Sequence, residues 1–215
     1  MKQARLDQLA DGIFAIVMTI LVFEVRIPDY IGIASEQTLL RSIFDIYPVF
    51  LSYLLSFSLL FTYWRSHHFI ASILAKNIDT RFSNLNAIFF FFVGLVPFSS
   101  HLLGRYSYSK TAIVFFALNV ILISLSLFRM RQYVIKSDTI ENVSVTKTEN
   151  EHANTRILFP MVAAFVAILV SFYNHNIAIV LFTLAIFFNI SNKSTKYTFL
   201  LIDFFRKGHN TSEMG

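Results

Sequence analysis

The sequence contains no cysteine and little charge: only 14% of its 215 residues are Asp, Glu, Lys or Arg, whereas soluble domains carry about a quarter. Without Cys there is no disulfide scaffold, thiolate metal site or thiol nucleophile. Hydrophobic residues make up 55% of the chain, and Phe alone contributes 25 of them. This balance predicts a protein that has lipid as its main solvent.

Familiar catalytic and cofactor motifs are also missing. The sequence has no H-E-x-x-H, G-x-S-x-G or Gly-rich phosphate loop, so no enzyme is predicted. A haem or metal site in a helix bundle needs His near the middle of the membrane on facing helices. Here His67 and His68 fall near one predicted surface, and His101 and His175 near the other. We therefore predict no cofactor.

Apolar stretches long enough to cross a bilayer recur along the chain. A hydrocarbon core of about 30 Å needs about 20 mostly apolar residues in a helix. The runs are continuous, and lipid leaves no partner for backbone polar groups, so each should be helical. We predict an all-α membrane domain over 1–192, with a cytoplasmic loop at 133–155 and a cytoplasmic tail at 193–215. Its six predicted spans are 6–26, 40–64, 82–103, 111–132, 157–173 and 176–192.

The basic residues predict an orientation. Most of the 18 Lys and Arg fall on one side if the N-terminus is cytoplasmic, and the outer side keeps only Arg26, Arg41, Arg105 and Lys110. We therefore expect a multi-pass protein of the cell membrane with both termini in the cytoplasm. The net charge of +5 follows from this bias, so no nucleic-acid partner is predicted.

Asp11 lies in the first predicted span, near its cytoplasmic end. A carboxylate at this depth costs several kcal/mol if it is left without a partner. The partner should lie on another helix, which makes Asp11 either a clasp between helices or a group that acts on ions directly. Candidates at the same level are Trp64, His67, His68, Asn84 and Asn86.

Beyond Asp11 the first helix carries an apolar stripe with one hydroxyl, at positions i, i+3, i+4 and i+7. The stripe consists of Ile16, Thr19, Ile20 and Phe23. It is either core within its own subunit or the lining of a pore, in which apolar rings gate by dewetting and hydroxyls replace part of a cation's hydration shell. Glu24 and Asp29 are either acids of an outer vestibule or solvated loop residues.

Six short spans enclose too little volume for a pathway within one subunit, so we expect assembly around a symmetry axis with one helix per subunit facing it. There is no T-V-G-Y-G, and the six Gly residues are scattered, so a filter of backbone carbonyls is not predicted. Any selectivity then has to come from side chains.

The start of the first helix resembles the transmembrane protein 175 family of potassium channels. That family opens this helix with R-x-x-x-F-S-D and an aliphatic run. Here Arg5 and Asp11 match, Leu9 and Ala10 replace the Phe and Ser, and Gly12 and IFAIVMTILVFEV follow. The segment YWRSHHF, with Trp64, His67 and His68, resembles the family's Trp-and-His region.

The resemblance implies a homotetramer of six-helix subunits with the first helix lining a central pore. It implies a potassium-preferring cation channel with Ile16 as the principal constriction, Thr19 as a hydroxyl layer that K⁺ meets transiently, and Ile20 and Phe23 as further rings. The implied partners are further copies of the chain, potassium ions and the bilayer.

A proton-coupled secondary transporter is the alternative. Asp11 with His67 and His68 could form a proton relay. Against it, the only candidate for a broken mid-membrane helix is at Gly94 and Pro97. Saturable, proton-coupled uptake supports a transporter, and passive electrogenic flux supports a channel.

Overall fold

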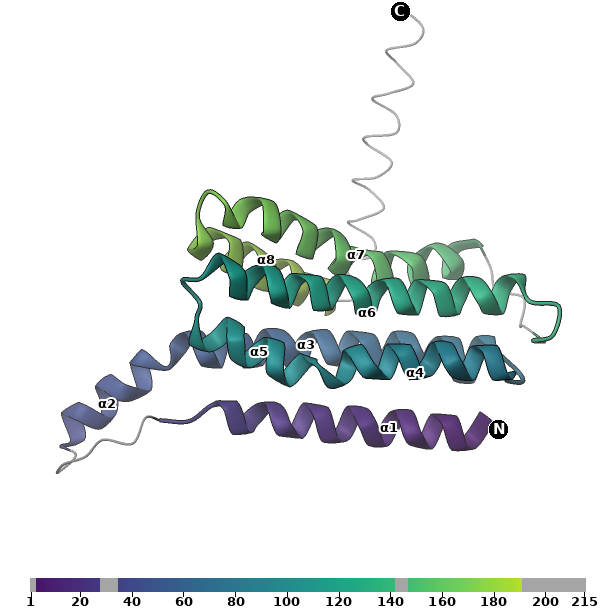
Figure 1. Ribbon diagram of the computed structural model, residues 1–215, viewed down its shortest axis with the longest axis horizontal. Coiled ribbons are helices and arrows are strands. Elements are labelled where there is room, and N and C mark those ends of the chain that lie inside the picture. Colours follow the sequence, from purple (N-terminus) through teal and green to yellow (C-terminus); the bar gives the residue numbers. More distant parts are fainter. Residues whose placement is uncertain (1–2, 28–34, 142–146, 191–215) are drawn as a thin grey trace, which may run out of the picture.

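The computed structural model describes residues 3–27, 35–141 and 147–190, and these form a bundle of helices (Figure 1). Asp29 and the predicted tail at 193–215 lie outside the described residues. The helices are α1 (Gln3–Ile20) with a 3₁₀ turn η1 (Leu21–Glu24), α2 (Glu36–Asp45), α3 (Tyr47–His68) with a π-helical end η2 (Phe69–Leu74), α4 (Thr80–Gly94), α5 (Val96–Arg105), α6 (Lys110–Lys136), α7 (Lys147–Ser171) and α8 (His175–Ile190).

The predicted all-helical membrane class is confirmed. Among the described residues, five helical segments are long and apolar enough to cross a bilayer: Gln3–Glu24, Tyr47–Leu74, Thr80–Arg105, Lys110–Lys136 and Ala153–Ser171. Part of α8, His175–Ile186, is apolar but shorter. The sixth crossing therefore stays a prediction.

The second predicted span, 40–64, has the wrong bounds. Residues 36–45 form the separate helix α2, which Ser35 caps by accepting the backbone N–H of Thr38. Helix α3 begins at Tyr47, with Pro48 in its first turn, where a missing N–H is harmless. The span continues through η2 to Leu74, ten residues beyond the predicted end. In Figure 1, α2 extends away from the bundle.

Two other predicted segments also differ. The span at 82–103 is divided at Leu95 into α4 and α5, which follow one another with Pro97 in the first turn of α5. The predicted loop at 133–155 is too long, because α6 continues to Lys136 and α7 begins at Lys147. Its polar sequence includes good helix formers such as Glu and Lys, and these extend a membrane helix into water.

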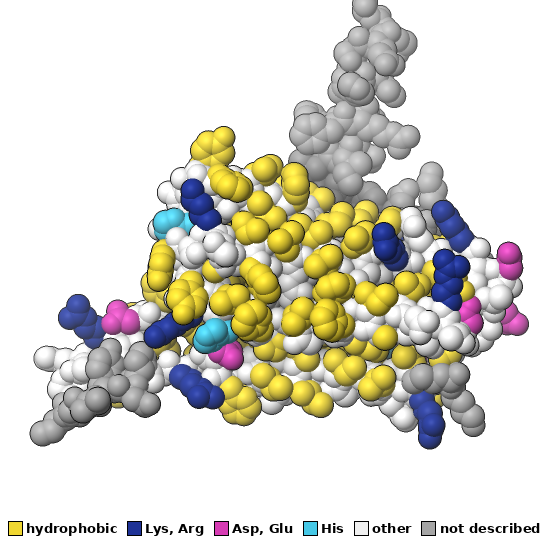
Figure 2. Space-filling model, in the orientation of Figure 1, with side chains coloured by type: hydrophobic (Ala, Val, Ile, Leu, Met, Phe, Trp, Pro, Cys, Tyr) yellow, Lys and Arg dark blue, Asp and Glu magenta, His cyan; other side chains and the backbone are white. Residues whose placement is uncertain are grey.

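The helices lie roughly side by side, with α1 at one edge of the bundle (Figure 1). Helix α1 packs against α3 and α4, while α6, α7 and α8 pack together on the far side. Hydrophobic side chains cover the middle of the visible face, and Lys and Arg lie toward its two ends (Figure 2). This is the surface expected of a helix bundle immersed in lipid.

We call the end of the bundle that carries the N-terminus the inner end and the opposite one the outer end. At the inner end, the connection between α3 and α4 is hydrogen-bonded to the end of α6 and the segment after it. Asp79 caps α4 by accepting the backbone N–H of Phe82 over 2.7 Å, and its other oxygen accepts the hydroxyls of Tyr133 and Thr139. Burial raises the pKa of Asp79, but these hydrogen bonds outweigh it and the net pKa is lowered. Asn77 adds a bond of 2.9 Å to the carbonyl of Thr139.

Candidate functional site

Helix α1 has one buried and one uncovered apolar face. Five residues spaced three or four apart are buried against the rest of the bundle: Leu6, Ala10, Phe14, Val17 and Leu21. The predicted stripe lies on the other side, with Ile16 60%, Ile20 40% and Phe23 58% exposed. The stripe is therefore not core within its own subunit.

The 3₁₀ turn η1 keeps the exposed residues in line at the outer end of this face. The α-helix ends at Ile20 and continues as a 3₁₀ turn from Leu21 to Glu24. In a 3₁₀ helix residues three apart are eclipsed, so Phe23 lies above Ile20 instead of drifting around the helix. The backbone carbonyl of Phe23 accepts the Nε–H of Arg26 over 2.6 Å, and this hydrogen bond satisfies one carbonyl at the end of the turn.

Thr19 is the one polar residue of the stripe. Its hydroxyl donates to the carbonyl of Ala15 over 2.6 Å. Because the hydroxyl proton is donated to this carbonyl, only the lone pairs of the hydroxyl oxygen are available on the exposed face of the helix. Such an oxygen can accept a cation or a water but has no proton left to donate.

At the inner end, Asp11 accepts the indole N–H of Trp64 over 2.9 Å. This confirms that the partner of Asp11 lies on another helix. Trp64 stacks on His68 with ring centroids 6.1 Å apart, and His68 contacts Ser72 over 3.2 Å. These groups join α1 to the end of α3.

The two neighbouring histidines have different environments. His68 is exposed, whereas His67 is buried and its Nε2 contacts Asn86 Oδ1 over 2.6 Å. Because the amide of Asn86 donates to the carbonyl of Phe82, its oxygen faces His67, which makes Nε2 the donor. The His67 ring also stacks on Phe89 at 5.2 Å. His67 is therefore a hydrogen-bonded packing residue between helices, and Asn84, another predicted candidate, is exposed.

No pattern in the sequence pointed to a role for Gln3. Its side-chain amide donates to the carbonyls of Ala71 and Ala75 over 2.7 and 2.8 Å. The first of these carbonyls belongs to the π-helical end of α3, where the wider i→i+5 pattern rearranges the ordinary ladder. One turn along α1, a carboxylate oxygen of Asp7 is buried without a hydrogen-bond partner in the described part of the chain.

The remaining residues of the motif are on the uncovered side of α1. Arg5 is exposed. Gly12 is also exposed, and nothing lies within 4 Å of a Cβ added there. Gly12 precedes Ile16 by one turn, so it continues the face of the stripe toward the inner end.

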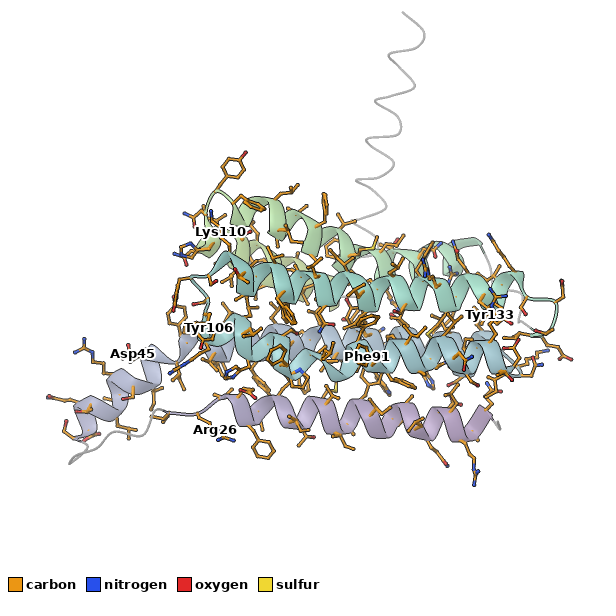
Figure 3. The ribbon with its side chains drawn as sticks, in the orientation of Figure 1. Arg26, Asp45, Phe91, Tyr106, Lys110 and Tyr133 are labelled. Atoms are coloured by element: carbon orange, nitrogen blue, oxygen red, sulfur yellow. The ribbon has the colours of Figure 1, made fainter. Side chains whose placement is uncertain are left out.

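At the outer end, Glu24 pairs with His101 of α5. The pair borders an open hollow of about 850 Å³ that Arg26, Asp45 and Arg105 also line. Arg26 follows α1 and Asp45 ends α2 (Figure 3). Within the residues that the structure describes, no group of three or more His, Asp or Glu gathers as a metal site.

These features define a polytopic helical membrane protein whose first helix is held at both ends and leaves an apolar face uncovered. Residues 5–97 match the family described as endosomal/lysosomal potassium channel TMEM175. The resemblance carried by Arg5, Asp11 and the Trp-and-His segment is therefore confirmed over that part of the chain.

Two relatives are named as potassium channels. The one from Chamaesiphon minutus is 33% identical over 105 residues, which cover 49% of this chain and 51% of the relative. The one from a Chryseobacterium species is 26% identical over 139 residues, which cover 64% and 68%. The chain thus spans about half the length of the first of these relatives. Both are named as channels and neither as an enzyme.

The fold is also that of a solved structure. A crystal structure described as a lysosomal potassium-selective channel TMEM175 homolog from Chamaesiphon minutus superposes with a TM-score of 0.71. The superposition covers 87% of this chain and 95% of the other, at 23% sequence identity. It establishes the fold of the bundle.

Proposed function

We propose that this chain is one subunit of a homotetrameric, potassium-preferring cation channel in which α1 of each subunit lines a central pathway. The observation that carries the proposal is the uncovered stripe on α1. Large apolar residues are also exposed on other helices, where they face lipid, and what distinguishes the stripe is that it lies on the helix that carries the family motif. The potassium-channel names of the relatives support the same function.

In this arrangement the stripe supplies stacked rings. Ile16, 60% exposed, forms the principal constriction, and Ile20 and Phe23 form further rings toward the outer end. Rings of large apolar side chains resist wetting, so they restrict ion passage without a charged barrier. The eclipsed geometry of η1 brings Phe23 into the same file as Ile20.

Thr19 supplies the polar layer between these rings. Its oxygen, with the proton given to Ala15, replaces part of the hydration shell of a passing K⁺. Potassium is then a transient ligand, and the channel works without a filter of backbone carbonyls and without a resident cofactor.

Charged groups stand at both ends of the pathway. Glu24 and Asp29 give the outer mouth negative charge, which concentrates cations, and His101 holds Glu24 in place. The inner mouth carries Arg5 and Asp11. Both termini lie in the cytoplasm of a multi-pass cell-membrane protein, as the distribution of Lys and Arg indicates.

The inner network positions α1 against the subunit. Trp64 holds Asp11 and stacks on the exposed His68, whereas the buried His67 bonds to Asn86 of α4. This separation does not favour the transporter alternative, because a proton relay needs Asp11 and both imidazoles in one connected chain. The relatives named as channels also argue against a transporter.

Flux through reconstituted protein tests this function. In liposomes, K⁺ should pass faster than Na⁺ in a passive, electrogenic way, and Ile16→Asn should raise the K⁺ flux because a polar ring wets more easily. Val162→Asn is the matched control, since Val162 on α7 is 57% exposed but away from α1. Assembly is checked by the mass of the purified complex.

The outcome that contradicts the proposal is clear. If Ile16→Asn forms tetramers and its flux equals that of the unaltered protein, α1 does not line the pathway. Saturable uptake that requires a proton gradient would replace the channel with a transporter.

A further inference from the structure

A second candidate site lies at the inner end of the bundle, away from the face of α1 that carries the stripe. An open hollow of about 670 Å³ lies between the start of α4, the end of α6 and the residues that follow α6. Three cations line it: Arg81 from α4, and Arg129 and Lys136 from α6. Figure 2 shows Lys and Arg side chains gathered at this end, beside the hydrophobic band.

The arrangement follows from the sequence. Arg129, Gln132, Tyr133 and Lys136 are spaced i, i+3, i+4 and i+7, which puts all four on one face of α6. Arg81 reaches the same face from the first turn of α4. The two helices pack against each other, so their basic residues share one hollow.

Arg81 and Tyr133 are held in place before any ligand binds. The guanidinium carbon of Arg81 lies 5.1 Å from the centre of the Tyr133 ring, a cation–π contact. The Tyr133 hydroxyl donates to Asp79, which also caps α4 and accepts the Thr139 hydroxyl. Because this network fixes the ring, it also fixes the cation above it.

The three cations have no anionic partner in the part of the chain that the structure describes. No carboxylate there lies within 4.0 Å of Arg81, Arg129 or Lys136, and the only acidic residue that lines the hollow is Asp138. Asp79 adds a second negative charge behind the lining, where it accepts the hydroxyls of Tyr133 and Thr139, so the three cations leave a net charge of +1. Such a cluster repels itself and favours an anion of matching charge.

The apolar surface beside the hollow indicates what kind of anion fits there. Toward the middle of the bundle, the same two helices expose large apolar side chains, among them Ile88 and Phe91 on α4 and Leu122 on α6. Figure 3 shows Phe91 on α4 and Tyr133 near the end of α6. A ligand that fits both parts has phosphates at the interface and acyl chains in the membrane. Basic pockets between helices on the cytoplasmic side bind such head groups.

We propose that the hollow lined by Arg81, Arg129 and Lys136 binds the head group of an anionic phospholipid. A cardiolipin-type lipid presents two phosphodiesters, each of which can pair with a different one of the three cations. Gln132 is placed to donate a further hydrogen bond, since it lines the hollow and is exposed. The proposal does not depend on ion conduction, because lipid binding is its own measurement.

The test uses native mass spectrometry of the purified full chain, with cardiolipin, phosphatidylglycerol or phosphatidylcholine added to the detergent. The unaltered protein should retain cardiolipin at least about tenfold more tightly than phosphatidylcholine. Arg129→Ala with Lys136→Ala should reduce cardiolipin affinity about tenfold or more, because each lost surface cation weakens attraction to anionic lipid. Both side chains are exposed, so folding should be retained, which circular dichroism checks.

Two controls make the test specific. Arg41→Ala with Arg105→Ala removes the same charge from exposed positions away from the hollow and should leave affinity within about twofold. Arg129→Lys with Lys136→Arg keeps the charge and should keep the lipid bound.

Four results would overturn the proposal. The first is equal retention of all three lipids, and the second is an equal loss in both alanine pairs. The third is displacement of the lipid by millimolar inorganic phosphate, which would make the hollow a soluble-phosphate site. If the Arg129 and Lys136 pair instead dissociates the oligomer, the hollow is a subunit contact and the lipid assignment fails.

Discussion

Trp64→Phe removes the indole N–H that donates to Asp11 over 2.9 Å and keeps an aromatic ring to pack on His68. A hydrogen bond to a charged group contributes about 1.5–3 kcal/mol net. The Asp11 side chain is exposed, so water competes for it, and we expect the lower end of this range. The free energy of unfolding should therefore fall by about 1.5 kcal/mol.

A double-mutant cycle isolates this bond from other effects of the two substitutions. Asp11→Ala, Trp64→Phe and the double variant are unfolded in detergent and followed by circular dichroism. A coupling energy of about 1–1.5 kcal/mol is expected, because the second substitution removes a bond that is already gone. Trp64 is the single Trp of the chain, so its fluorescence emission should also shift in Asp11→Ala.

Additive effects within about 0.3 kcal/mol would refute the clasp between Asp11 and Trp64. Asp11→Asn then separates structure from charge, because an amide oxygen still accepts the indole N–H. Normal stability with reduced K⁺ flux would show that the carboxylate acts on ions. Normal stability with normal flux would limit Asp11 to its bond with Trp64.

Three further predictions concern the stripe and the inner connection. Gly12→Leu adds a side chain where nothing lies within 4 Å of a Cβ, so the subunit should fold normally while K⁺ flux falls; Gly12→Ala should have a smaller effect. Ile20→Cys introduces the only Cys of the chain, and mild oxidation should link subunits on a denaturing gel, whereas Val162→Cys should not. The lowered pKa of Asp79 predicts that its contribution to stability is present above about pH 4 and lost as the pH falls further. Asp79→Asn should flatten that dependence in unfolding measurements at pH 7 and pH 3, and an unchanged slope would exclude Asp79 as its source.

The membrane class could be predicted from hydrophobicity and the grouping of the stripe on one face of the first helix from periodicity, but whether that face is buried or exposed was left open. A residue three or four positions from another must share its face, so Ile16, Thr19 and Ile20 had to lie together. That Asp11 needs a partner on another helix followed from the cost of a carboxylate in lipid. The sequence could not single out Trp64 from the other candidates, because that choice depends on distances between helices, which residue spacing within a helix does not determine.

The helix breaks could not be read from hydropathy. Hydropathy alone does not place a helix end at Asp45, because Arg41 and Asp45 lie among apolar residues at the start of the predicted span 40–64, yet only Asp45 ends α2. At Lys147 the error was the reverse. Charged and polar residues there predicted a loop, but they form the first turns of α7. The π-helical end of α3 has no sequence signature, so the bond from Gln3 to the carbonyl of Ala71 within it was not foreseen.

The attachments of α1 limit how it can move. Gln3 fastens the inner end to the carbonyls of Ala71 and Ala75, and the pair of Glu24 with His101 fastens the outer end. A piston-like shift along the helix axis would break all of these bonds together. A twist or bow of the middle would leave these end bonds intact and act on the bond between Asp11 and Trp64. In the proposed tetramer, a stimulus that widens the rings would therefore cost least if it turned Ile16 aside while both ends stay anchored.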